Sequence, residues 1–105
     1  MKFEYEVKVE TGVLLTLHPD FKSVEVQQAF MDDFSSSIFA VDTFDELLRH
    51  VASQVAIHGC GFIEGFGHVR ESWDCDFTKP ISDFQNVAYA EYEILECDVV
   101  KVLNV

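Results

Sequence analysis

The chain has 105 residues, of which 19 are acidic and 7 are basic, so its formal net charge is −12, and 49% of its residues are hydrophobic. This length fits a single domain over residues 1–105, and the hydrophobic content argues against global disorder. The acidic balance disfavours direct binding to nucleic-acid phosphates or to anionic membranes, because both need clustered Lys and Arg.

The start of the chain and its cysteines bear on its compartment. The first ten residues alternate charged and apolar side chains and contain no apolar stretch typical of a secretory signal. The longest apolar stretches are too short to cross a bilayer. The 3 cysteines form no close pairing motif. We therefore expect free thiols and a cytoplasmic location.

The first segment has the clearest strand pattern. Apolar side chains occupy alternate positions from Phe3 to Val9, and charged side chains occupy those from Lys2 to Glu10. This period of two predicts a strand with one buried and one wet face. Thr11 and Gly12 break the alternation, which predicts a turn and then a second strand over 13–17.

Residues 23–34 are ambiguous. Apolar side chains at i, i+4 and i+8 favour a helix, whereas the Val-Glu-Val start also suits a strand. We favour the helix. The serines that follow end it, and the apolar segment 38–41 is expected to be a brief strand.

The strongest helix pattern covers residues 44–58. Thr43 and Glu46 have the spacing of a capping box at its start. Apolar residues then recur every three or four positions from Phe44 to Ala56, and Gly59 is placed to end the helix.

The rest of the chain predicts a glycine-studded strand over 59–70, a long polar loop over 71–84 and a strand-rich run over 86–103 with a bend or bulge at Asp98. The expected fold is α+β, with a mainly antiparallel sheet of four or five strands. The long amphipathic helix 44–58 and a shorter helix near 23–34 would pack on one face, and the first and last strands would be neighbours.

Motifs that carry chemistry are missing from the sequence. The glycines from 59 to 67 follow a helix instead of opening one, so they offer no phosphate site. No metal-ligand spacing is present, and we expect no metal, cofactor or catalytic residue, with the histidines at the surface. Asp74 and Asp76 flank Cys75 and should raise the pKa of its thiol. The alternative is a small enzyme or ligand-binding domain with a cleft near residues 58–68, formed by His58, Cys60, Glu64 and His68.

Trp73 lies in an acid-rich loop. It suits either an interface anchor or a lid folded back on the core. The net charge exceeds what solubility alone needs and would steer association with basic partners. The candidate partner-binding residues are Asp32, Asp33, Glu71, Trp73, Asp74, Asp76, Glu91 and Glu93.

In its size, its acid-rich surface and its lack of catalytic motifs, the whole chain resembles the small acidic phage proteins of the anti-CRISPR type, which block bacterial defence. The resemblance implies a non-enzymatic inhibitor, in the cytoplasm of the host cell, that mimics phosphate charge. Its partner would be a protein or nucleoprotein with a basic, nucleic-acid-binding surface. Another alternative is a homo-oligomeric structural subunit that pairs through an edge strand. Monomer and homodimer both remain open.

Overall fold

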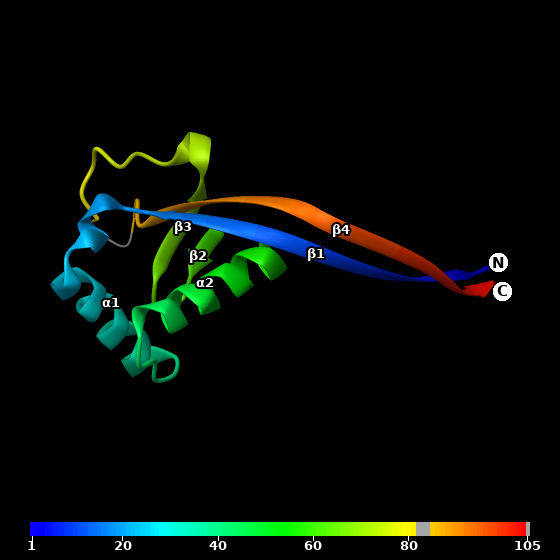
Figure 1. Ribbon diagram of the computed structural model, residues 1–105, viewed down its shortest axis with the longest axis horizontal. Coiled ribbons are helices and arrows are strands. Elements are labelled where there is room, and N and C mark those ends of the chain that lie inside the picture. The colour runs from blue at the N-terminus through cyan, green and yellow to red at the C-terminus, as the bar shows by residue number, and fades with distance from the viewer. Residues whose placement is uncertain (82–84, 105) are drawn as a thin grey trace.

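The computed structural model describes residues 1–81 and 85–104. It has two helices and one curled sheet of four strands in the order β1-β4-β3-β2 (Figure 1). The elements are β1 (Phe3–Leu17), the 3-10 turn η1 (Pro19–Lys22), α1 (Val24–Ser37), α2 (Phe44–His58), β2 (Gly61–Ile63), β3 (Gly67–Glu71), the 3-10 turn η2 (Ser72–Asp74) and β4 (Ala88–Asn104).

The sheet is mixed, with two antiparallel pairings, as expected of a mainly antiparallel sheet, and one parallel pairing that was not expected. β1 pairs antiparallel with β4, and β2 pairs antiparallel with β3. β3 and β4 run parallel, with Val69 beside Ala88. The parallel pair arises because the segment between β3 and β4 returns the chain to the end of the sheet at which β3 began.

β1 is one continuous strand, so the predicted turn at Thr11 and Gly12 is wrong. β4 offers it a partner along its whole length. The register shifts between Glu10 and Thr11, where Leu95 is the extra residue of β4. Leu95 lies over Gly12: a Cβ at Gly12 would be 3.3 Å from Leu95 Cδ1. Gly12 therefore leaves room for the Leu95 side chain within the strand, a second role that glycine has in strands besides making turns.

The same register corrects the expected irregularity at Asp98. β4 continues through Asp98, which lies opposite Lys8. Its extra residues are Leu95 and Val102 instead. Such bulges increase the local twist of a ribbon.

The two helices lie on one side of the sheet (Figure 1). α2 is capped by Thr43, whose hydroxyl accepts the Glu46 N–H at 3.2 Å, and the Glu46 carboxylate accepts the Asp42 N–H at 3.1 Å. α1 is capped by Ser23 and extends to Ser37, beyond the expected end at residue 34. α2 packs against β1 and β2, and α1 packs against α2.

Two short segments differ from expectation. Residues 38–41 form no strand; Val41 is buried, and its N–H donates to Ser35 Oγ at 3.1 Å. Residues 59–70 form the β2–β3 hairpin instead of one strand. Gly65 makes the turn with a φ of +80°, and a Cβ there would lie 2.9 Å from Phe34 Cδ2. The buried ring of Phe34 thus requires glycine at this turn.

The segment after β3 covers the sheet face opposite the helices. The ring of Phe77 stacks on that of Tyr89 with centroids 5.3 Å apart. His18 is buried, contrary to expectation, and fixes this segment: Nε2–H donates to the Lys79 carbonyl at 2.9 Å, and Nδ1 accepts the Asp20 N–H at 3.1 Å. Residues 82–84 of the predicted 71–84 loop lie outside the described residues.

The hydrophobic core fills the space between the helices and the wide end of the sheet. Its largest fully buried side chains are Phe34, Leu47, Val51, Val55, Phe66, Val69 and Val87. Val13, Leu15 and Leu17 of β1 pack against this core from the sheet.

The outer halves of β1 and β4 project from this body as a two-stranded ribbon, with both chain ends at its tip (Figure 1). We call residues 3–10 and 94–104 the arm. The radius of gyration is 17.2 Å and the principal extents are 57 × 31 × 21 Å. A compact domain of this length would have a radius of gyration of about 13 Å. The arm accounts for the difference.

Candidate protein-binding surface

The arm has two chemically different faces. Directly paired residues of an antiparallel ribbon project to the same face. One face continues the side on which Val13, Leu15 and Leu17 meet the core. We call it the apolar face, and it carries Phe3, Tyr5, Val7, Val9, Ile94 and Val99. We call the opposite one the acidic face. On the arm it carries Glu4, Glu6, Glu10, Glu96 and Asp98, and it continues onto the body with Glu91 and Glu93.

The acidic face is largely uncompensated. Glu10 and Glu96 are directly opposite each other. The ion pair that this face makes within the described ranges joins Lys8 to Glu6 at 3.5 Å, between well-exposed side chains. Like charges directly opposite destabilise a ribbon, and an exposed ion pair contributes little. The opposed acids therefore destabilise the folded chain, and the ion pair with Lys8 compensates for little of this loss.

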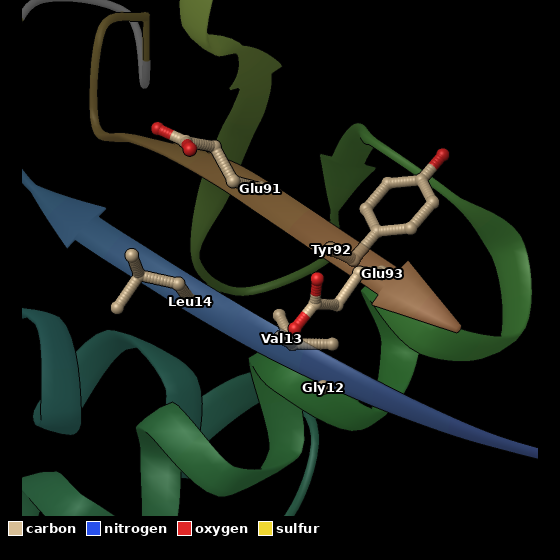
Figure 2. Close-up of a pocket in the computed structure, with 6 residues that line it drawn as sticks. All are labelled: Gly12, Val13, Leu14, Glu91, Tyr92 and Glu93. Atoms are coloured by element: carbon tan, nitrogen blue, oxygen red, sulfur yellow. The ribbon is translucent and has the colours of Figure 1, made fainter. Parts of the chain in front are cut away.

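A shallow depression of about 420 Å³ lies where the acidic face meets the body. Figure 2 shows Glu91 and Glu93 on β4 beside Gly12 and Leu14 on β1. Leu14 is 63% exposed. An exposed apolar side chain opposite one carboxylate and near a second suits a Lys or Arg, whose methylene stem packs on Leu14 while its cation meets the acids.

Trp73 is 82% exposed, so the lid alternative is wrong. It lies in η2, the yellow-green turn on the sheet side opposite the helices (Figure 1). Arg70 holds this turn by an ion pair to Asp74 at 3.2 Å and a hydrogen bond to Gln85. Trp73 thus stands on the same side of the sheet as Glu91 and Glu93.

The structure divides the other predicted acids. Asp74 is neutralised by Arg70, and Asp76 accepts the N–H and hydroxyl of Thr78 at 2.9 and 2.5 Å. Those two hydrogen bonds lower the pKa of Asp76. Both acids lie in the segment on the Trp73 side, but they serve local structure.

Asp32 and Asp33 are exposed on α1, on the helix side of the sheet. Glu71 pairs in register with the buried Ala90 and therefore projects to the helix side as well. The predicted set is thus not one surface. Sequence reasoning missed the acids of the arm, Glu4, Glu6, Glu10, Glu96 and Asp98, although the alternation over residues 2–10 and the carboxylates of the last strand were the available signal.

The expected cleft near residues 58–68 is present in part. A cavity of about 510 Å³ is lined by His50, His58, Cys60 and Glu64 among others. His68 lies outside it, with its ring 5.1 Å from that of Phe62. No group of three or more potential metal ligands occurs among the residues described.

The thiols beside these sites are not activated. Burial, followed by the charge of Glu71, raises the pKa of Cys60 above its ordinary value. Burial is also the main cause of the raised pKa of Cys75, to which Asp76 and Asp74 add. The raised pKa of Cys75 was predicted from its two neighbours, but their contribution is secondary. A nucleophilic thiol needs the opposite shift.

Within the described chain, no helix has the length and apolar character needed to cross a membrane. Comparison with protein-family models, with curated proteins and with solved structures gives no match for this chain.

Proposed function

We propose that this protein is a non-enzymatic binding protein whose acidic face occupies a basic surface of a protein or nucleoprotein. The observation that carries the proposal is the pair of carboxylate rows on a projecting ribbon, with Glu10 and Glu96 opposed and uncompensated. A charge arrangement that weakens the free chain is explained if a cationic partner neutralises it.

The spacing of the rows supports a phosphate-mimicking role. Alternate residues of a strand lie about 6.8 Å apart, and neighbouring strands lie about 4.8 Å apart, so the two rows form a narrow band of negative charge. A basic groove that binds a nucleic-acid strand would accept such a band. An inhibitor of the anti-CRISPR type, which blocks a nucleic-acid-binding surface, is the function that this geometry supports best.

The base of the acidic face supplies the specific contacts. The depression at Leu14, Glu91 and Glu93 would take a partner's Lys or Arg side chain. Trp73, on the same side of the sheet, would add a large apolar contact. Electrostatic attraction would then speed association, and these contacts would slow dissociation.

The test compares three immobilised chains in capture from a bacterial lysate across a salt series. The fourfold acidic-face variant, called the arm variant below, carries Glu10→Gln, Glu91→Gln, Glu93→Gln and Glu96→Gln. The control carries Glu25→Gln, Asp32→Asn, Asp33→Asn and Asp42→Asn, which changes the net charge equally but on the helix side. This control also tests the two predicted residues of α1.

We expect the wild type and the control to retain one basic protein or nucleoprotein at low salt, and nucleic acid to compete with that retention. The arm variant should lose it. Equal retention by all three chains, loss in the control, or failure of nucleic acid to compete would contradict the proposal.

A further inference from the structure

We propose that a second copy of this chain covers the apolar face, so that two arms pack face to face with their acidic faces outward. The inference does not depend on what the acidic face binds. It rests on the continuity of the apolar face, its area and the distribution of charge between the two faces of the arm.

The apolar face of the arm continues the face of the sheet that the helices cover in the body. In the body, Val13 and Leu15 of this face pack against the core between the sheet and the helices. α2 ends at His58, and the same alternation continues outward to Phe3 with about half of each side chain exposed, for example 50% for Phe3 and 57% for Val99. A two-stranded ribbon is only marginally stable in water. A cover over this face would stabilise it.

The exposed area is sufficient for a stable pair. Using the exposed fractions of the six apolar side chains of this face, roughly 600 Å² per copy is available, so a face-to-face pair would bury up to about 1,200 Å² from them, the lower end of the range for specific interfaces.

The distribution of charge permits a second copy on this face. Among the described side chains of the arm, the acids project to the acidic face, whereas the apolar face carries one cation, Lys101, whose Nζ lies 5.0 Å from the centroid of the Phe3 ring. Stacked sheets lie about 10 Å apart, and the outward carboxylates would lie farther apart still. At physiological salt the Debye length is about 8 Å, so repulsion between the two acidic faces would be largely screened.

Charge also disfavours the edge pairing that the sequence suggested. Edge-to-edge pairing of two arms would bring their carboxylate rows about 4.8 Å apart and leave the apolar face in water. Face-to-face packing avoids both penalties. A two-fold axis would make the contact the same for both copies.

The test measures the mass of the chain by sedimentation from about 1 to 100 μM at physiological salt. This range of concentrations would detect a dimer with a micromolar dissociation constant. The monomer mass is 12.0 kDa, and we expect twice that value at the upper concentrations. Val99→Lys and Val100→Lys are matched variants, because these neighbours are 57% and 51% exposed but project to opposite faces.

We expect Val99→Lys to weaken the dimer at least about tenfold, and Val100→Lys to change it less than about threefold. The double variant Val7→Thr, Val9→Thr keeps shape and strand propensity and should also weaken the dimer, which guards against misfolding of the lysine variant. A constant mass of 12.0 kDa, or equal behaviour of the two lysine variants, would overturn the inference. The fourfold acidic-face variant should remain dimeric, so failure of the proposed function would be seen separately.

Discussion

Glu10 and Glu96 lie directly opposite each other across the β1–β4 ribbon, immediately before the register shift at Leu95. The next pair toward the tip on the same face, Lys8 and Asp98, has charges of opposite sign. These two cross-strand pairs share a face and an exposed setting, so they separate local repulsion from the effect of net charge.

Glu96→Lys should raise the free energy of unfolding by about 0.5–1 kcal/mol, because it replaces a repulsive cross-strand pair with an attractive one. Asp98→Lys makes the same change in net charge but places two cations opposite each other, so it should not stabilise the chain and should lower that free energy. Urea unfolding at low salt measures both, and 1 M salt should reduce both effects. Stabilisation by both variants to the same extent would show that net charge alone is responsible.

Gly65→Ala should destabilise the fold by about 2–4 kcal/mol, because strain at a positive φ adds to the clash with the buried Phe34 ring. Gly59→Ala has the same φ of +80° but open space around its Cβ, so the strain alone should cost about 1–2 kcal/mol. Gly61→Ala, with open space and no positive φ, should change stability by less than about 0.5 kcal/mol. Equal losses in the first two variants would contradict the role assigned to Phe34.

Local periodicity predicted the elements whose environment is simple. The stripe from Phe44 to Ala56 predicted the helix that forms α2, and the alternation from Phe3 to Val9 predicted its strand and the pairing with the end of the chain. The continuity of β1 through Gly12 was not predictable from local sequence, because a Thr-Gly pair suits a turn unless a distant strand is available to pair with it. The turn at Gly65 was not predictable for a similar reason, because the Phe34 ring that leaves no room for a Cβ there belongs to α1, far away in the sequence.

The candidate surface was predicted only in its chemistry. Charge and composition predict an acidic binding surface. The predicted residues, however, are spread over the chain, whereas the structure gathers two rows of carboxylates on the β1–β4 ribbon. Alternation shows that Val7 and Glu6 face opposite ways, yet it cannot show whether the apolar face is covered within the same chain. That depends on where α2 ends relative to β1, which is a property of the tertiary structure.

The Cys60 thiol should react slowly with iodoacetamide at pH 8 and should accelerate only above the ordinary thiol pKa of 9.0, because burial and Glu71 raise its pKa. Glu71→Gln should lower the pKa of Cys60 and speed its alkylation. Cys75 is the control: its pKa is raised by burial, and Glu71 is not among the causes. An unchanged pH profile at Cys60 in this variant would contradict the coupling.

The raised pKa of Cys60 also has a defined sign for stability. The folded state holds the thiol proton more tightly than the unfolded state, so this contribution is fully present below the ordinary pKa of 9.0. It is lost as the pH rises through the folded-state pKa. The pH dependence of urea unfolding between pH 8 and pH 10 should therefore be less steep in Cys60→Ser, and an identical slope would contradict the expected linkage.

His18→Leu should lower the free energy of unfolding by about 2–3 kcal/mol, because it leaves the Lys79 carbonyl and the Asp20 N–H without their partner in a buried setting. His68→Leu is the matched control, since His68 is only partly buried and makes a ring contact with Phe62. It should cost less than about 1 kcal/mol. Hydrogen exchange should also show faster exchange at the Asp20 amide in His18→Leu alone. Because one imidazole joins the end of β1 to the segment that carries Trp73, loss of stability without faster exchange at Asp20 would show that His18 acts through its packing against Phe77 and not through these hydrogen bonds.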